Sequence, residues 1–130
     1  MSLLRTFGIS ASALTAERYR MDVISSNLAN ANTMRMNGVD PYRRRVVELM
    51  QSRDGSVAIT GTVQDMSPFR AIEDAGNPYA DANGLVYYSN VDPITEMVDM
   101  ISASRAYEAN LNAFNLTKQM LQNALDIGRV

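Results

Sequence analysis

Apolar residues recur at alternate steps of three and four positions along the last third of the chain. This spacing corresponds to a period of about 3.5 residues, typical of a helix whose apolar seam packs on a partner helix along its length. Asp92 is suited to cap such a helix and Pro93 to occupy its first turn, so we expect a helix from Pro93 to about Gly128. The seam positions are Met97, Met100, Ser104, Tyr107, Leu111, Phe114, Lys118, Leu121 and Leu125.

The N-terminal part of the chain shows the same spacing from position 3 to about 31. We expect this helix to end in the run Asn30-Ala31-Asn32-Thr33, because Asn and Thr side chains favour turns over helix interiors. Its seam positions are Leu3, Phe7, Ser10, Leu14, Glu17, Met21, Ile24, Leu28 and Ala31. The sequence leaves open whether each seam meets the other helix of the same chain or a helix of another copy. It also leaves open whether the polar seam residues are tolerated irregularities or select one register.

The residues between the two helices predict a small β-rich region. Alternating patterns predict strands over 42–50 and 56–63, with a hairpin turn at Arg53-Asp54-Gly55-Ser56. Shorter strands are expected over 68–72 and 85–88. Asn37-Gly38 is a turn signal, and Asp81-Ala82-Asn83-Gly84 is interpreted as a turn because it lacks the later ligands of a calcium loop.

These patterns predict an α+β fold in which long N- and C-terminal helices form one helical domain interrupted by the β-rich insert. The expected boundaries are 1–33 for the first helix, 34–91 for the insert and 92–130 for the second helix.

Composition narrows the possible functions. The 130 residues contain no Cys and no His, which excludes thiolate nucleophiles, imidazole bases and Cys/His zinc sites. A net charge of −2 does not suit nucleic-acid binding. We therefore expect no enzyme activity, no cofactor or metal and no nucleic-acid partner. We also expect neither a membrane-inserted segment nor a cleaved signal peptide, since no sufficiently long apolar run is present.

Arg43, Arg44 and Arg45 form the one notable basic run. They are interpreted either as a solvated strand edge, where charge discourages edge-to-edge pairing, or as a partner site with intersubunit salt bridges.

Two segments resemble the bacterial flagellar rod and hook proteins. The first joins Ser12-Ala13-Leu14-Thr15-Ala16-Glu17-Arg18 to Ser26-Asn27-Leu28-Ala29-Asn30-Ala31-Asn32-Thr33 and is similar to the N-terminal signature of rod proteins. The second comprises Asn90-Val91-Asp92, Glu96-Met97 and Ala103-Ser104-Arg105-Ala106-Tyr107-Glu108-Ala109-Asn110, which is similar to the C-terminal signature. With Asp81-Ala82-Asn83-Gly84-Leu85-Val86 and the short insert, the chain is most similar to members that build the proximal rod. Asn77-Pro78 departs from the His-Pro pair of many relatives.

The resemblance implies a structural axial subunit of the proximal rod, the drive shaft between the motor ring and the hook. It implies an antiparallel coiled coil of the two terminal helices that packs with copies of itself and with other rod subunits. It also implies export through the flagellar type III apparatus and a place in the basal body, spanning the periplasm. The alternative is a soluble helical adaptor or export chaperone-like binding module.

Two sets of residues are candidates for assembly. The intersubunit packing candidates are Phe7, Leu14, Met21, Leu28, Met97, Met100, Tyr107, Leu111, Phe114, Leu121 and Leu125. The candidates for fixing helix ends and register are the polar residues Asn27, Asn30, Asn32, Arg105 and Glu108.

Overall fold

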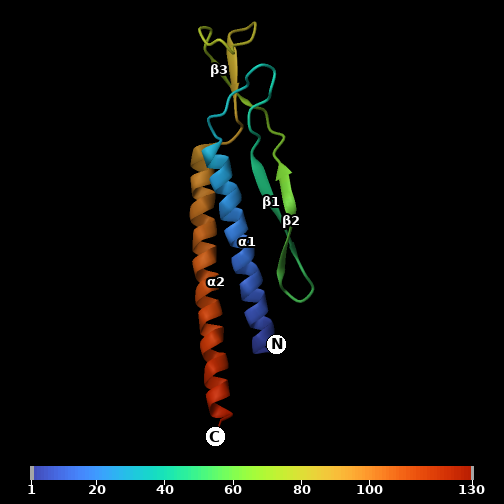
Figure 1. Ribbon diagram of the computed structural model, residues 1–130, viewed down its shortest axis with the longest axis vertical. Coiled ribbons are helices and arrows are strands. Elements are labelled where there is room, and N and C mark those ends of the chain that lie inside the picture. The colour runs from blue at the N-terminus through green and yellow to red at the C-terminus, as the bar shows by residue number, and fades with distance from the viewer. Residues whose placement is uncertain (1, 130) are drawn as a thin grey trace. The chain divides into compact units, whose positions relative to one another are not determined.

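The computed structural model describes residues 2–129 and contains two long helices and four short strands (Figure 1). The elements are α1 (Leu3–Ala29), β1 (Arg45–Gln51), β2 (Val57–Gln64), β3 (Arg70–Glu73), β4 (Leu85–Tyr88) and α2 (Pro93–Ile127). The predicted α+β class is confirmed, with both helices where the apolar periodicity placed them. The chain divides into two compact units, 1–21 with 47–61 and 101–130, and 22–46 with 62–100.

In the first unit, the beginning of α1 lies beside the later part of α2 (Figure 1). The rings of Phe7 and Phe114 are 4.1 Å apart between centroids. The buried positions around them carry small side chains: Ser10, Ala16, Ala103 and Thr117. Small residues allow two helix backbones to approach closely. The contact between α1 and α2 in this unit therefore combines small buried side chains with the larger Phe7–Phe114 pair.

The β1–β2 hairpin belongs mostly to the first unit, and its turn contacts α1. The predicted turn is confirmed: Gly55 has φ of 90°, which favours glycine, and Ser52 N donates to Ser56 O at 2.8 Å. The Arg5 guanidinium donates to Asp54 O at 3.0 Å, and Val57 N donates to Ser12 Oγ at 3.1 Å. The turn is therefore held by polar groups of the first helix.

In the second unit, β4 forms the buried centre of a small antiparallel sheet. It pairs with β3 in the register Ile72 to Val86, and its other edge meets the chain leaving α1, where Arg35 N donates to Tyr87 O at 2.8 Å. Val86 and Ser89 have no exposed surface. The Asn37-Gly38 turn is confirmed, because both residues have positive φ (51° and 78°), as a two-residue hairpin turn requires.

The stripe of α2 that is shielded from solvent differs from the predicted seam at every second position. Met100, Tyr107, Phe114 and Leu121 are half-buried as expected, but the alternate positions are Glu96, Ala103, Asn110 and Thr117. Within the chain, these alternate positions shield small and polar side chains in place of the apolar residues of the predicted seam, whose packing against another copy stays a prediction. Met97, Leu111, Lys118 and Leu125 are exposed.

The first predicted strand was placed three residues too early. Backbone N–H groups in this segment donate to side chains. Tyr42 N donates to Thr33 Oγ1 at 3.0 Å, Arg44 N to Asn90 Oδ1 at 2.7 Å, and Arg45 N to Asn27 Oδ1 at 3.0 Å. The strand therefore begins at Arg45, where ladder pairing takes over.

Candidate functional site

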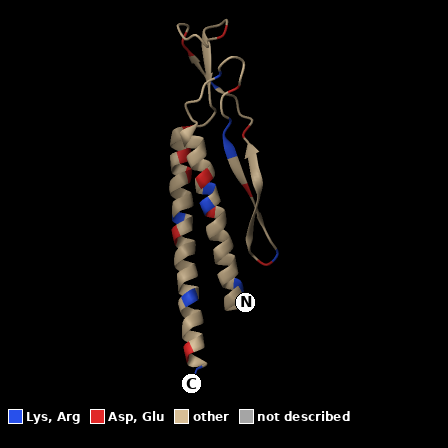
Figure 2. Cartoon of the chain, in the orientation of Figure 1, with Lys and Arg blue, Asp and Glu red and all other residues tan. Residues whose placement is uncertain are grey.

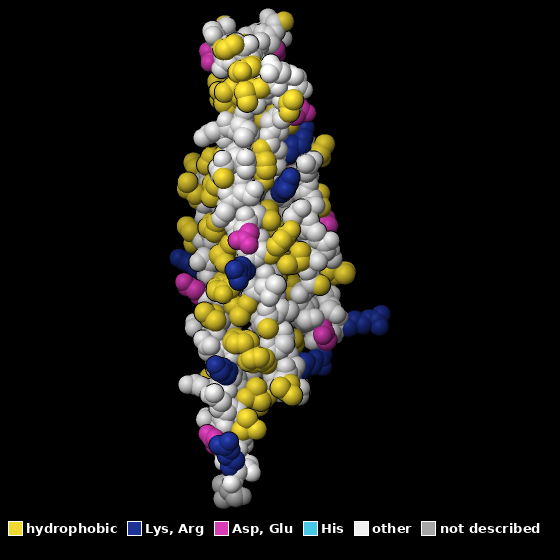
Figure 3. Space-filling model, in the orientation of Figure 1, with side chains coloured by type: hydrophobic (Ala, Val, Ile, Leu, Met, Phe, Trp, Pro, Cys, Tyr) yellow, Lys and Arg dark blue, Asp and Glu magenta, His cyan; other side chains and the backbone are white. Residues whose placement is uncertain are grey.

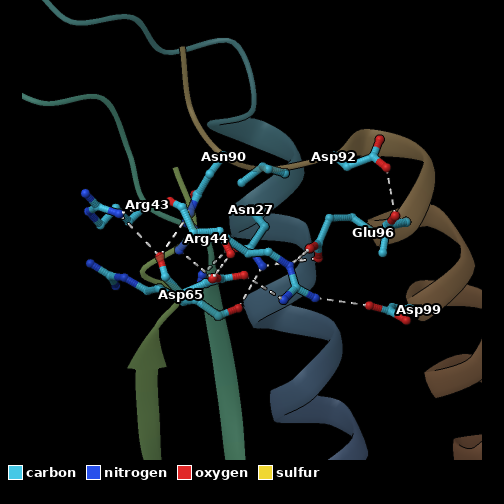
Figure 4. A network of polar contacts seen from close by, with 12 residues as sticks. Asn27, Arg43, Arg44, Asp65, Asn90, Asp92, Glu96 and Asp99 are labelled. Atoms are coloured by element: carbon cyan, nitrogen blue, oxygen red, sulfur yellow. Dashed lines mark hydrogen bonds and ion pairs between the residues drawn. The ribbon is translucent and has the colours of Figure 1, made fainter. Parts of the chain in front are cut away.

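Arg44 lies at the centre of a polar cluster in the second unit (Figure 4). Its Nε donates to Glu96 Oε1, its Nη2 lies 3.3 Å from Asp99 Oδ2, and its Nη1 lies 3.5 Å from Asp65 Oδ2. The side chain of Glu96 is only 1% exposed, while that of Arg44 is 23% exposed. We name Asn27, Arg44, Asp65, Asn90, Glu96 and Asp99 the Arg44 cluster.

Local structure explains how these side chains meet. Glu96 and Asp99 are three residues apart on α2, so they project from the same side of the helix. Arg44 and Asp65 face each other at the open end of the β1–β2 hairpin, where Asp65 N donates to Arg44 O at 2.8 Å. Asp92 caps α2 as predicted, with Ile94 N donating to its Oδ1 at 3.2 Å, and this fixes where the first turn places Glu96.

Asn27 joins the end of α1 to this cluster. It is 1% exposed and uses both ends of its amide. Its Nδ2 donates to Arg45 O at 2.9 Å and to Glu96 Oε2 at 3.1 Å. Its Oδ1 accepts from Arg45 N at 3.0 Å and from the Tyr42 hydroxyl at 2.9 Å. One buried amide thus fixes α1, the start of β1 and α2 together.

The surrounding carboxylates favour the charged form of Arg44. Burial by itself lowers the pKa of Arg44, but the hydrogen bond and charge of Glu96, with Asp65 and Asp99, outweigh it and raise the pKa above its ordinary value. A guanidinium presents several donors in fixed geometry, which suits one cation serving three carboxylates. The hydrogen bonds and ion pairs of the cluster join the end of α1, the residue after β2 and the first turns of α2, so the arrangement is suited to holding these segments together.

We expect Asn27→Ala to lower the free energy of unfolding by about 1–3 kcal/mol, because it removes the hydrogen-bond partner of Glu96 Oε2 and of the part-buried backbone N–H and C=O groups of Arg45. Urea unfolding followed by circular dichroism measures the change. Asn32→Ala is the matched control, since Asn32 is exposed. Equal effects of the two substitutions would contradict the role assigned to Asn27.

Three aspartates, Asp54, Asp65 and Asp81, have a pKa below the ordinary value, so the free energy of unfolding depends on pH in the acid range. Hydrogen bonds from the Ser67 hydroxyl and then Ser67 N lower the pKa of Asp65, with Arg44 adding to the effect. Backbone N–H groups of Leu85 and then Asn83 lower the pKa of Asp81. These carboxylates hold protons more weakly in the folded chain than in the unfolded chain, where the pKa is about 3.9. Their contribution is complete above that value and is lost as the pH falls through the lower folded values.

We therefore expect the urea midpoint to fall between pH 5 and pH 2.5, and to fall less steeply in Asp65→Asn. Urea titrations by circular dichroism at these two pH values test this. Asp126→Asn serves as the control because Asp126 is exposed in the last turn of α2. An unchanged slope in Asp65→Asn would show that other groups cause the acid sensitivity.

Away from the cluster, α2 carries exposed apolar side chains in the second unit. Ile94, Met97 and Val98 are 73%, 55% and 60% exposed, and they lie on the side of the helix opposite Glu96. Their spacing of three and four residues makes one continuous stripe. We call these three residues the outer face of α2. Figure 3 shows many such hydrophobic side chains at the surface, and Figure 2 shows few charges along α2. Exposed apolar patches are common at interaction surfaces, so the outer face of α2 is a candidate for one.

The structure places the predicted packing residues in two environments. Phe7, Leu14, Met21, Leu28, Met100, Tyr107, Phe114 and Leu121 are half-buried, and Phe7 and Phe114 contact each other within the chain. Met97, Leu111 and Leu125 are exposed, by 55%, 37% and 67%. Only the exposed set is open to another subunit without rearrangement, and packing between subunits stays a prediction for both sets.

The candidate register residues are also dispersed. Asn27 belongs to the Arg44 cluster, and Asn30 ends α1 by donating from Nδ2 to Ser26 O at 2.8 Å. Asn32, Arg105 and Glu108 are exposed. The sequence did not predict the roles of Arg44 and Glu96. Two signals were available: alternation along a strand places Arg44 on the face opposite Arg43 and Arg45, and Glu96 lies in the first turn of the predicted helix.

Comparison with known proteins identifies the family. Residues 7–35 match the model described as flagella basal body rod protein, and residues 82–127 match the C-terminal model of flagellar basal body rod FlgEFG proteins. The flagellar basal-body rod protein FlgC of Bacillus subtilis is 41% identical over 150 residues, covering 99% of this chain and 100% of the relative. FlgC of Salmonella typhimurium is 38% identical over 134 residues, and FlgC of Aquifex aeolicus is 37% identical over 131. The chain belongs to the FlgC family.

The two matched segments correspond to distinct parts of this FlgC-family fold. One covers most of α1 and the turn after it, and the other covers β4 and α2. Asn27 and Glu96 lie inside the matched segments, whereas Arg44 and Asp65 come from the insert between them. Within residues 2–129, no helix is both long and apolar enough to cross a membrane.

Proposed function

We propose that this chain is a structural subunit of the flagellar rod, in its proximal part, and that it assembles through α1 and α2. Membership of the FlgC family supports a rod subunit of the flagellar basal body. The structural observation that carries the assembly mechanism is the outer face of α2. A helix that packs on one side within the chain and remains apolar on the other side has a second surface available for another subunit.

Burial of that face supplies a driving force for assembly. Complete burial of an apolar side chain of this size contributes about 1.5–3 kcal/mol, so three such side chains provide a substantial gain for each contact. The first unit offers further exposed apolar positions on α2 at Leu116, Met120 and Ile127. The partners proposed on this basis are other copies of the chain and other rod subunits.

The proposal also covers export of the chain to the site of rod assembly. Export through the flagellar type III apparatus in an unfolded form, without a cleaved signal peptide, suits a chain with no Cys to oxidise on the way. The small side chains between α1 and α2 bury little area within one chain, so docking on neighbours contributes to ordering the helices. The rod then spans the periplasm, with this chain near the motor ring.

Deletion of the gene followed by electron microscopy of isolated basal bodies tests this function. We expect motor rings that carry no rod, with rods and motility restored when the unchanged gene is supplied on a plasmid. An intact rod and hook in the deletion strain would contradict a structural role and favour the soluble adaptor.

A further inference from the structure

The second unit contains a basic pocket beside the Arg44 cluster. It is lined by Asp40, Pro41, Tyr42, Arg43, Arg45 and Gln64 and has a volume of about 300 Å³. Asp40 is paired with Arg35 at 2.8 Å. Among residues 2–129, no carboxylate lies within ion-pair distance of Arg43 or Arg45. The pocket therefore presents two guanidinium groups whose charge is not balanced within the described chain.

Aromatic rings hold these guanidinium groups in place. Arg43 lies over the ring of Phe69 at 4.1 Å and donates to Ser67 O at 3.3 Å. Arg45 lies over the ring of Tyr42 at 5.7 Å, and its side chain remains exposed. A guanidinium stacked on a ring loses little further conformational freedom on binding a carboxylate, and its remaining N–H donors stay available. The pocket is thus preorganised for an acidic partner.

The same unit carries an acidic surface at a different place. From Ala71 to Ser104 the chain contains no Lys or Arg but six acids, Glu73, Asp74, Asp81, Asp92, Glu96 and Asp99. Four of these are engaged: Asp81 orders its own turn, Asp92 caps α2, and Glu96 and Asp99 bind Arg44. The other two, Glu73 and Asp74, are adjacent and exposed where β3 ends, and Asp74 Oδ2 accepts a long hydrogen bond of 3.5 Å from Asn77 Nδ2. Figure 2 shows the acidic residues of the loops and the arginines at the start of β1 in different places along the chain.

We propose that Glu73 and Asp74 of one copy of this chain dock in the Arg43–Arg45 pocket of the next copy. The inference rests on the proposed rod function and specifies one of its subunit contacts. Two carboxylates match two guanidinium groups, which gives charge complementarity across the contact. In the proposed contact each copy offers its acidic residues to one neighbour and its pocket to another, which is a heterologous arrangement, and its repetition without closure produces an open helical assembly.

Disulfide cross-linking tests the contact, because the chain has no Cys and gives no background. We expect the double variant Glu73→Cys/Arg45→Cys, expressed in place of the wild type, to form a ladder of dimers and larger species in basal bodies under mild oxidation. The single variants should form no ladder, and a mixture of the two single variants should form only dimers. The matched control is Glu48→Cys/Arg45→Cys, since Glu48 is an exposed acid on β1.

Three outcomes would overturn the inference and leave the rod assignment in place. Basal bodies with rods but no ladder would show that the two surfaces do not meet. Dimers of Arg45→Cys alone would show a symmetric contact, and a product with the mass of another rod subunit would identify a different occupant. Failure to build any rod in the gene-deletion strain when the wild-type gene is returned would instead question the strain and the function.

Charge exchange gives a second, independent readout. We expect Glu73→Arg to reduce swimming in soft agar at least tenfold and Glu73→Arg/Arg45→Glu to restore most of it. The Glu48→Arg variant, with the same change in net charge, should swim normally. Equal impairment by Glu48→Arg, or no rescue in the double variant while both proteins fold normally by circular dichroism, would contradict the contact.

Discussion

Replacement of Arg44 by alanine is expected to lower the free energy of unfolding by about 3–5 kcal/mol, the range found when one partner of a buried ion pair is removed. The reason is the environment of Glu96, whose side chain is 1% exposed and whose charge is balanced by Arg44. Without the guanidinium, that buried carboxylate keeps its hydrogen bond from Asn27 but has lost the cation that balances its charge. Asp65 and Asp99 lose the same partner. We expect loss of motility as a consequence.

Urea unfolding by circular dichroism measures the effect of Arg44→Ala. Arg45→Ala is the matched control, because Arg45 is adjacent and exposed and forms no ion pair within residues 2–129. The double variant Arg44→Met/Glu96→Gln removes both charges and should recover part of the loss. A change below about 0.5 kcal/mol in Arg44→Ala, the size expected for an ordinary surface substitution, would show that the cluster does not stabilise the fold.

Met97→Asp is expected to abolish rod assembly while leaving the isolated chain folded. Met97 is 55% exposed on the outer face of α2, so the substitution changes the stability of the separate chain by only about 0.5 kcal/mol. In the assembled rod the same position would place a charge against an apolar partner, which costs several kcal/mol at every repeated contact. Soft-agar motility and electron microscopy of basal bodies report assembly, and circular dichroism reports folding.

The conservative variant Met97→Leu separates loss of apolar contact from loss of the particular side chain. It should swim normally, because it retains the apolar surface. Normal rods in the Met97→Asp strain would remove the outer face of α2 from the assembly mechanism, whereas an unfolded Met97→Asp chain would show that Met97 stabilises the subunit itself.

Local sequence signals were sufficient for most of the secondary structure. The Asp92 cap and Pro93 gave the start of α2, and the Asn-Thr run gave the end of α1, because capping and turn preferences act within a few residues. The Asn37-Gly38 and Arg53–Ser56 turns were predicted for the same reason, since a positive φ strongly limits which residues fit. β4 was placed at Leu85–Tyr88, as observed.

The Arg44 cluster could not be derived in this way. Its members Asn27, Arg44 and Glu96 are distant along the chain, and no local rule links them. Arg44 was grouped with Arg43 and Arg45 as a basic run, yet the backbone around it gives the three side chains different neighbours. Glu96 appeared to be an ordinary acid in the first turn of a helix, although it is fully buried.

Tertiary contacts also decided which side of α2 faces α1. Heptad periodicity identified both helices and the need for partners, but apolar residues occupy two sides of α2, and periodicity alone does not say which side meets α1. The sequence by itself therefore determined the elements, the ends of both helices and the absence of Cys and His chemistry. Only the tertiary structure decided that Glu96 faces inward and Met97 outward, because a buried carboxylate is tolerable only where Arg44 and Asn27 are present to bind it.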